Sequence, residues 1–277
     1  MLAFLGKFFA ERRLDCFAAI RLSDCRIERP YLLERAGIAD GTAILLAVPY
    51  HTSAADTPGR NLSAYAVVRD YHGFFKELFD ELIPALQAAF PEHKFAGFAD
   101  HSPIAEVEAA AKAGLGIIGK NHLLITEKYS SYIFLGEVVT DARLPCKTGE
   151  IRSCEDCGAC MRACPAGKIG TCLSALTQKK GKLTNEEKAT LLRYGSVWGC
   201  DICQEVCPHT KAARRSGTLD TKIAYFNEQT LPVLTCKELD AMDDETFSHR
   251  AYAWRGRPTI RRNLRMFEDS ETEGGND

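Results

Sequence analysis

Residues 154–165 read CEDCGACMRACP, and residues 200–208 read CDICQEVCP. The first run has the spacing Cys-x2-Cys-x2-Cys-x3-Cys-Pro, which is typical of bacterial segments that bind 4Fe–4S clusters. Gaps of two residues let three thiolates from one tight loop reach the same face of a cluster. In proteins with two clusters, the fourth cysteine of such a run ligates the other cluster. The pattern therefore predicts two clusters and requires further cysteine ligands elsewhere in the chain.

The second run supplies three of the further ligands, and Cys172 stands in the sequence where the remaining one is needed. The crossing rule predicts that one cluster is held by Cys154, Cys157, Cys160 and Cys207, and the other by Cys164, Cys172, Cys200 and Cys203. The alternative is a pair of structural zinc sites built from the Cys-x2-Cys units. Zinc does not account for the interlocked pattern ending in Cys-Pro, which occurs almost twice. The remaining cysteines are isolated, and we expect ordinary thiols at Cys16, Cys25, Cys146 and Cys236.

The overall charge is close to neutral, with 35 basic and 37 acidic residues and a net charge of −2. This balance gives no global attraction to nucleic acid or to an anionic membrane, although a local basic patch could still bind either. The first 15 residues, MLAFLGKFFAERRLD, are interrupted by Lys7 and lead to no small-residue cleavage site, unlike a signal peptide. No stretch approaches the ~20 apolar residues that span a bilayer. We therefore expect a cytoplasmic protein with no membrane partner, in which clustered, reduced thiols bind metal.

Five apolar runs predict strands, at residues 16–22, 43–48, 95–99, 123–126 and 132–140. Two segments have helical spacing, residues 64–79 and 104–113. The second is preceded by Ser102-Pro103, a good cap followed by a proline suited to the first helical position. Strands and helices alternate without a strict βαβ rhythm. This order predicts an α+β fold, with a mixed sheet flanked by helices over residues 1–145.

A change of composition near Leu144-Pro145 predicts a domain boundary. We expect an α/β domain over residues 1–144 and a cysteine-rich domain over 145–230, where metal replaces part of a hydrophobic core. Residues 231–277 return to helical patterning and end in EDSETEGGND. That acidic, glycine-containing end predicts a disordered tail.

Residues 114–119 read GLGIIG and formally spell the dinucleotide-binding pattern GxGxxG. The fingerprint follows a strand and opens a helix, whereas this one follows helix-like EVEAAAKA and precedes strand-like HLLIT. We therefore reject dinucleotide binding. The glycines favour a tight turn, or a close approach of the backbone to another flat or anionic ligand.

Three polar features each have more than one interpretation. Asp100 directly precedes His101-Ser102-Pro103, and the residues alone favour a helix cap, whose low pKa suits a proton donor poorly. A role as an acid requires burial that raises its pKa. The mixture in Tyr65–His72 (YAVVRDYH) favours an exposed helical face. Six arginines near the C-terminal end have two possible interpretations, a helix face that is solvated or paired within the protein, and a phosphate-binding site. They are Arg250, Arg255, Arg257, Arg261, Arg262 and Arg265.

Taken together, these residues resemble the epoxyqueuosine reductases, cobalamin-dependent iron–sulfur enzymes of tRNA queuosine synthesis. The matching blocks follow the family's order: YAVVRDYH at 65–72, FADHSPIAE at 98–106, AGLGIIGKNHLLI at 113–125, FLGEVVT at 134–140 and the two cysteine runs. A further block, RGRPTIRRNL at 255–264, resembles the segment that closes the family's catalytic region. The resemblance spans almost the whole chain.

The resemblance implies a nitroreductase-like, mixed-sheet cobalamin-binding domain followed by a ferredoxin-like domain with two 4Fe–4S clusters. In that family the clusters pass electrons to cobalamin, which drives removal of the epoxide oxygen from epoxyqueuosine to give queuosine. Asp100 occupies the position of the family's proton donor, and this reverses its interpretation as a cap. The matching positions imply cobalamin contacts at Arg69, Tyr71, His72, Gly114, Gly116, Gly119, Lys120 and Asn121.

The resemblance also implies tRNA or a queuosine-like molecule as substrate, and a low-potential electron donor such as flavodoxin or ferredoxin. The chain has His101-Ser102 where the family usually has Thr-Gly, and we expect a short form without the family's C-terminal helical-repeat domain, which helps grip tRNA. Both departures concern the substrate more than the cofactors. Two other functions stay open. One is a two-cluster electron-transfer protein, and the other is a corrinoid reductase acting on a different substrate, such as a halogenated compound.

Overall fold

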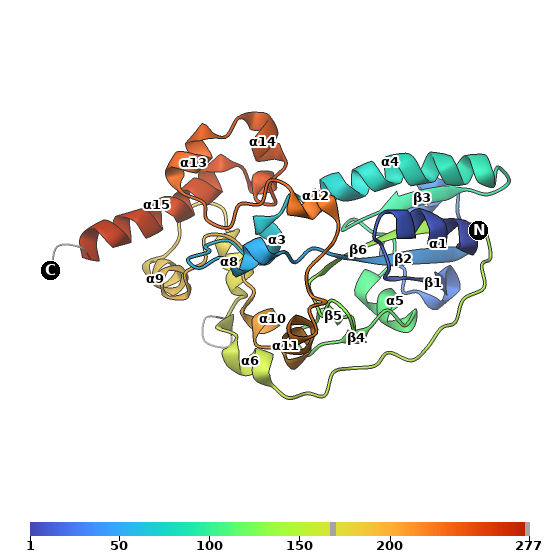
Figure 1. Cartoon of the computed structure of the whole chain (residues 1–277), viewed down its shortest axis with the longest axis horizontal. Coiled ribbons are helices and arrows are strands. Elements are labelled where there is room, and N and C mark those ends of the chain that lie inside the picture. The colour runs from blue at the N-terminus through green and yellow to red at the C-terminus, as the bar shows by residue number, and fades with distance from the viewer. Residues whose placement is uncertain (167–169, 275–277) are drawn as a thin grey trace. The chain divides into compact units, whose positions relative to one another are not determined.

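The computed structural model describes residues 1–166 and 170–274 and contains a four-stranded sheet in the order β1-β2-β6-β3 (Figure 1). The predicted strands are confirmed as β1 (Phe17–Arg21), β2 (Thr42–Pro49), β3 (Phe95–Phe98) and β6 (Ile133–Thr140). All neighbouring strands of this sheet are antiparallel. The α+β class is therefore confirmed, but the prediction of a mixed sheet is wrong, because an apolar run carries no information about strand direction.

The other described elements are a second sheet of two short strands and the helices. The strands β4 (Ile117–Ile118) and β5 (Leu124–Ile125) pair with each other. The α-helices are α1 (Leu2–Glu11), α2 (Pro30–Ala36), α3 (Ala64–Val67), α4 (Tyr71–Ala89), α5 (Glu106–Lys112), α6 (Ala159–Ala163), α8 (Leu173–Thr177), α9 (Asn185–Tyr194), α10 (Ile202–Glu205), α11 (Pro208–Arg215), α12 (Ala224–Asn227), α13 (Cys236–Ala241), α14 (Asp244–Ser248) and α15 (Arg257–Gly274). The 3-10 helices are η1 (Leu22–Asp24), η2 (Ser53–Asp56) and η3 (Ala253–Arg255).

Helices cover both faces of the four-stranded sheet (Figure 1). On one face, α4 packs closely because Gly136 of β6 has no side chain. A Cβ there would lie 2.3 Å from Phe75. On the other face, alanines of α5 share a hydrophobic core with Leu45 of β2 and Val139 of β6. The sheet is thus the middle layer of three, and side chains that point from β6 toward α5 are buried.

The described chain divides into two compact units, each made of separate stretches of sequence. The first unit comprises Met1–Tyr50, Tyr71–Gly158 and Pro208–Ile223, and the second comprises His51–Asp70, Ala159–Cys207 and Ala224–Asp277. The sheet belongs to the first unit. The three consecutive domains ending at residues 144, 230 and 277 stay a prediction from composition.

The core of the second unit is centred on Trp198 and Tyr252, which are fully buried with ring centroids 6.1 Å apart. Asn263 of α15 is also fully buried. Its side-chain amide donates to the backbone oxygens of Thr177 and Val197, at 2.8 Å each. Buried amides are stable only when they are hydrogen-bonded, so these two bonds tie α15 to the segment that leads into the second cysteine run.

The helix predicted over residues 64–79 is interrupted, and that prediction is wrong between α3 and α4. The backbone oxygen of Val67 accepts from Leu231 N at 2.8 Å, and Asp70 N donates to His249 O at 2.9 Å. These partners take the groups that would otherwise form helical hydrogen bonds. The residues of YAVVRDYH therefore do not form one exposed helical face.

The second predicted helix begins two residues later than residue 104. Ala105 N donates to Arg26 O at 3.0 Å, and Pro103 O accepts from Glu28 N at 2.8 Å. This non-local pairing holds residues 103–105 outside the helix, so Ala105, not Ser102, is the N-cap residue of α5. The cap interpretation of Asp100 is wrong for the same reason.

The C-terminal end differs from its predicted disorder over the residues that the structure describes. α15 continues to Gly274, and residues 275–277 of the predicted tail lie outside the described residues. Over residues 1–166 and 170–274, no helix combines the length and the apolar character that crossing a bilayer requires.

Candidate functional site

An open pocket of ≈ 250 Å³ lies in the first unit, with Asp100 and Glu106 among its lining residues. Most of its wall is apolar, including Val107, Leu123, Leu124 and Ile133. Phe134 of β6 lies between two aromatic rings, with ring centroids 4.3 Å from Tyr71 and 4.2 Å from Tyr50. Flat rings and aliphatic side chains with few polar groups form a wall typical of an organic ligand site.

Asp100 follows β3, and its side chain is 68% exposed at the pocket. Its backbone has φ +63°, a left-handed conformation that Asp adopts more readily than most residues. His72 Nε2 lies 3.7 Å from Asp100 Oδ2, and the ring of Tyr71 packs on His72 with centroids 4.1 Å apart. The structure thus brings together three predicted site residues. Their catalytic and cofactor-binding roles stay predictions.

Two acidic side chains that were not predicted as site residues lie next to each other, and one of them contacts Asp100. Glu137 of β6 is fully buried, and its strand neighbours are Leu45 and Phe98. Glu106 is the first residue of α5, and it accepts a hydrogen bond from the backbone of Asp100. An acidic residue inside the apolar strand FLGEVVT was the available sequence signal, because a lone carboxylate is rarely buried without a function or a partner.

Burial determines the protonation of both of these carboxyl groups. It raises the pKa of Glu106 to about 7 and the pKa of Glu137 well above its usual range, and the neighbouring charge of Glu106 raises the latter further. The Ser102 hydroxyl contacts Glu137 Oε1 and lies 3.0 Å from Ile104 O. Glu106 at the pocket wall and the buried Glu137 behind it therefore form an acidic pair that resists full ionisation at neutral pH.

The glycine-rich turn is explained largely by its own packing. Gly114 has φ +85°, and a Cβ on Gly116 would lie 2.4 Å from Ile125 O. A Cβ on Gly119 would lie 2.4 Å from Asn121 Oδ1. Glycine is therefore required where this turn closes onto β5. The turn follows α5 and precedes a strand, which confirms the order on which the rejection of dinucleotide binding rests.

The same turn contacts the first cysteine loop within the first unit. Cys154 N donates to Ile118 O at 3.1 Å. Lys120 Nζ lies 2.7 Å from Asp156 Oδ1, and Asp156 itself has φ +51°. A cation and a backbone bridge thus hold the loop between Cys154 and Cys157 in place. The predicted cobalamin contact by Lys120 stays a prediction.

Arg69 belongs to the second unit. Its guanidinium lies 3.9 Å from the centroid of the Tyr225 ring. The Tyr225 hydroxyl in turn donates to Asp70 O at 2.8 Å, and Arg69 forms a backbone bridge with Arg250. The predicted cobalamin contact by Arg69 stays a prediction, and its described environment is aromatic.

The cysteines predicted for the second cluster lie wholly in the second unit. Burial raises the pKa of the Cys200 thiol to about 12, and the neighbouring Cys203 and Cys172 raise it further. Ala166 N donates to Cys164 Sγ at 3.4 Å. A buried thiol with two other cysteines close to it fits a site where metal binding deprotonates the thiols. None of the cysteines forms a disulfide.

Cluster ligation by the eight cysteines stays a prediction. α6, which carries Cys160, packs against α10, which carries Cys203. Within residues 1–166 and 170–274, no three His, Cys, Asp or Glu side chains converge as ligands of a single metal ion.

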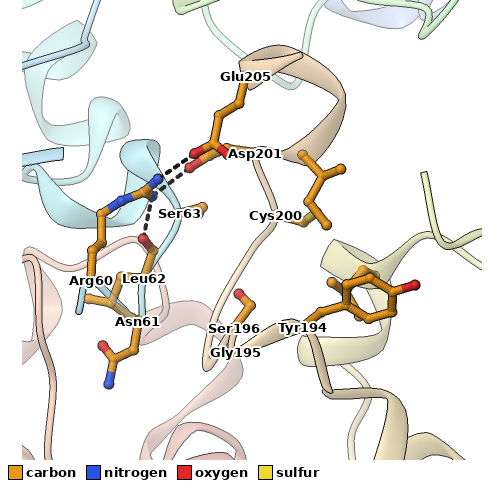
Figure 2. A pocket seen from close by; sticks show the side chains of 12 residues that line it. Arg60, Asn61, Leu62, Ser63, Tyr194, Gly195, Ser196, Cys200, Asp201 and Glu205 are labelled. Atoms are coloured by element: carbon orange, nitrogen blue, oxygen red, sulfur yellow. Dashed lines mark hydrogen bonds and ion pairs between the residues drawn. The ribbon is translucent and has the colours of Figure 1, made fainter. Parts of the chain in front are cut away.

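A second pocket, of ≈ 190 Å³, adjoins Cys200 in the second unit (Figure 2). Arg60 forms ion pairs with Asp201 at 2.6 Å and with Glu205 at 2.7 Å, and it also donates to Leu62 O. Figure 2 shows Asp201 next to Cys200 and Glu205 on the helix that follows. The Arg60 pairs therefore fasten the second cysteine run to the segment before α3.

The arginines between Arg250 and Arg265 are mostly engaged inside the protein. Arg250 is buried and donates to Gln229 O at 2.7 Å. Arg257 donates to Leu239 O and Met242 O, and Arg262 donates to Lys179 O and Gly181 O. These bonds favour the self-paired interpretation, since the guanidinium groups are used to join backbone segments.

Two family models match parts of this chain. Residues 153–210 match a model described as a 4Fe-4S double cluster binding domain, which supports iron–sulfur clusters. Residues 39–101 match a model described as epoxyqueuosine reductase QueG, DUF1730. The first match contains both cysteine runs, and the second contains Arg69, Tyr71, His72 and Asp100.

Curated relatives and solved structures agree with these matches. The epoxyqueuosine reductase of Leadbetterella byssophila is 34% identical over 220 residues, which are 76% of this chain and 70% of that protein. The structure of epoxyqueuosine reductase from Streptococcus thermophilus has a TM-score of 0.77 at 22% identity, over 96% of this chain and 80% of that one. An epoxyqueuosine reductase crystallised with a tRNA-Tyr epoxyqueuosine-modified stem loop has a TM-score of 0.74 at 23% identity, over 96% and 80%. At these identities the structural likeness establishes the fold.

Proposed function

We propose that this chain reduces the epoxide of epoxyqueuosine to the alkene of queuosine, because it belongs to the epoxyqueuosine reductase family of oxidoreductases. The observation that carries the proposal is a carboxyl-bearing, largely apolar pocket in the same chain as a double-cluster segment. An acid and a source of electrons are the two things that reductive removal of an oxygen atom requires.

The clusters of this proposal are held by the crossed quartets. Cys154, Cys157, Cys160 and Cys207 hold one cluster, and Cys164, Cys172, Cys200 and Cys203 hold the other. The proximity of Cys172 and Cys203 to Cys200, whose pKa both of them raise, supports the second quartet. A low-potential donor such as flavodoxin or ferredoxin supplies electrons one at a time.

Cobalamin is the second cofactor of the proposal, in a nitroreductase-like first unit. The stacked rings of Tyr50, Phe134 and Tyr71, and the aliphatic wall beside them, fit the face of a large flat macrocycle. The open pocket accommodates part of so large a molecule. When bound, cobalamin would supply the strongly reducing metal that breaks the C–O bonds. His72, Tyr71 and the Gly114–Asn121 turn would help to hold it.

Asp100 is the proton donor of the proposal. It lines the pocket 3.7 Å from His72, and a cofactor bound there would cover its exposed side chain and so supply the burial that a role as an acid requires. A carboxyl group within reach of the departing oxygen can donate as that oxygen gains charge. The left-handed backbone at Asp100 supports a functional role, because unusual backbone conformations are concentrated at functional sites.

The substrate of the proposal is epoxyqueuosine in tRNA, with the free nucleoside as the alternative. An electron-transfer protein without a corrin, the second function suggested by the sequence, predicts a first domain packed without a cavity. The ≈ 250 Å³ pocket argues against that function. No described contact favours a halogenated substrate over an epoxide.

Activity of anaerobically reconstituted protein tests the proposal. Protein loaded with iron, sulfide and cobalamin is mixed with reduced flavodoxin and with epoxyqueuosine, in a tRNA stem loop or as the nucleoside. Mass spectrometry should detect a product lacking one oxygen atom, and protein without cobalamin should form none. Fully loaded protein that reduces neither substrate would overturn the proposed function.

A further inference from the structure

The Glu106–Glu137 pair has a feature that the proposed roles of Asp100 and the clusters do not use. The two carboxyl groups lie within hydrogen-bonding reach of each other, yet two ionised carboxylates have no proton to place between them. In the part of the chain that the structure describes, Glu106 Oε1 and Glu137 Oε2 are buried and receive no hydrogen bond from a donor group. One proton shared by the pair would let one carboxyl group donate a hydrogen bond to the other.

The groups around the pair decide whether that proton is retained. Asp100 adds negative charge beside Glu106, and Arg29 opposes it. Arg29 Nη1 donates to Ser102 O at 2.9 Å and so is partly engaged elsewhere. Cys25 on the sheet side is a thiol whose pKa burial raises to about 12, and it stays neutral. Burial of the pair outweighs Arg29, so the pair keeps one proton at neutral pH.

The proposed reaction requires more protons than Asp100 can supply at once. Removing an epoxide oxygen as water breaks two C–O bonds, forms one C=C bond and consumes two electrons and two protons. The electrons come one at a time from the low-potential donor. Asp100 has a single carboxyl group and provides one proton before it must be protonated again. A second acid at the same pocket would complete the balance.

We propose, building on the proposed function, that Glu106 delivers the second proton to the departing oxygen and that the buried Glu137 holds Glu106 ready to do so. Glu106 lines the same pocket as Asp100 and contacts its backbone. Glu137 is a positioning residue, since it is fully buried on β6 and acts through Glu106. After delivery both carboxyl groups are ionised, and the pair regains its proton from solvent through the open pocket.

Turnover and its pH dependence test the proton delivery. Glu106→Gln keeps the size of the side chain but has no acidic proton, so turnover should fall at least about tenfold while both clusters are retained. Wild-type turnover should decline above about pH 7, where the pair loses its proton, and the remaining activity of Glu106→Gln should lack this decline. The control is Glu108→Gln, two residues along α5. Glu108 pairs with Arg26 and Lys112 and does not line the pocket.

Stability measured against pH is a readout independent of turnover. The folded chain holds this proton up to about pH 7, whereas the unfolded chain releases it near the ordinary pKa of 4.5, so stability is lost as pH rises between these values. The denaturation midpoint of wild type should therefore fall relative to Glu106→Gln between about pH 5 and 7 and stay level above that range. Glu108 has a lowered pKa and is ionised throughout this range, so its Gln variant should show a constant difference.

The infrared band of a protonated carboxyl group gives a third measurement. It should be present in wild type at pH 7 and should shift or weaken in Glu137→Gln and in Glu106→Gln, because each variant removes one of the two carboxyl groups. If Glu106→Gln has the same turnover and pH profile as wild type, on a substrate that wild type reduces, this inference is overturned but the proposed function is not. A wild type with both cofactors and no turnover overturns the proposed function, and the role of Glu106 with it.

Discussion

The four-stranded sheet and the cysteine segment of residues 154–207 are stabilised in different ways. The sheet is buried between α4 and α5, and all eight residues of β2 are buried. The apolar cluster formed mainly by the cysteine segment itself is small, with Leu173, Leu176, Leu183 and Leu191, although Trp198 near its end joins the core of the second unit. Helices α6, α8 and α10 have four or five residues each, too few to be stable alone. Hydrophobic burial therefore explains the sheet, whereas the cysteine segment depends on what its thiols bind.

Removal of one ligand tests this contrast with the largest expected effect. Cys164→Ala should reduce bound iron from about eight to about four atoms per chain, because Cys164 completes a four-iron cluster with Cys200 and Cys203. Hydrogen exchange should accelerate strongly in α8 and α10, while β2 and β6 stay protected. Cys146→Ala, at an isolated cysteine, is the control and should keep all its iron. Loss of the cluster signal belonging to Cys154–Cys160 would show the crossed pairing to be wrong.

A substitution at the pocket of the first unit should change activity and leave stability almost unchanged. Asp100→Asn should lower turnover at least about a hundredfold, because the amide cannot donate a carboxylic proton. Its side chain is 68% exposed, so unfolding free energy should change by less than ~1 kcal/mol. Asp80→Asn on α4 is a matched control, since Asp80 is 63% exposed and pairs with Lys76. Rapid-mixing turnover and urea unfolding measure the two effects; near-normal turnover by Asp100→Asn removes it from the mechanism.

The close contact between the sheet and α4 predicts a stability effect without a cluster effect. A Cβ on Gly136 would lie 2.3 Å from Phe75, so Gly136→Ala should destabilise the protein by about 1–3 kcal/mol. Gly6→Ala in α1 has space, with its nearest contact at 4.0 Å from Phe17, and should stabilise by up to about 1 kcal/mol. Urea unfolding gives both values. A change in unfolding free energy of the same sign in both variants, or a loss of iron in Gly136→Ala, would contradict the view that the sheet and the cysteine segment are stabilised separately.

The sequence predicted the sheet strands because each coincides with an apolar run. It did not predict the end of α3, where Val67 O and Asp70 N bond to residues 231 and 249. Partners more than 160 positions away leave no mark on local helical spacing. The same holds for the start of α5, where the pairing of Ala105 with Arg26 decides the first helical residue.

In the candidate site, too, features set by local spacing could be predicted from the sequence, and features set by contacts between distant residues could not. The cysteine spacing names candidate cluster ligands, since a fixed spacing within a loop is itself the chemical requirement. Glu106 and Glu137 lie 31 positions apart, and only the packing of α5 on β6 brings their carboxyl groups together. A buried acid in FLGEVVT was visible in the sequence, but its partner was not.

The smallest expected effect concerns Lys120, which joins the glycine turn to the first cysteine loop through Asp156. Both side chains are about half exposed or more, at 47% and 62%, and exposed ion pairs contribute roughly 0–1 kcal/mol. Lys120→Gln should therefore leave unfolding free energy within ~1 kcal/mol of wild type and keep the iron. Removing a cation beside a cluster disfavours the more negative reduced form, so the reduction potential of that cluster should become more negative.

The control for this variant is Lys76→Gln on α4, which breaks another exposed pair, with Asp80. It should leave stability and both potentials unchanged. Redox titration followed by paramagnetic resonance measures the potentials, and urea unfolding measures stability. A loss above about 2 kcal/mol in Lys120→Gln would mean that the ion pair holds the cysteine loop in its fold. An unchanged potential would mean that Lys120 neither tunes the cluster nor lies close enough to its charge to be felt.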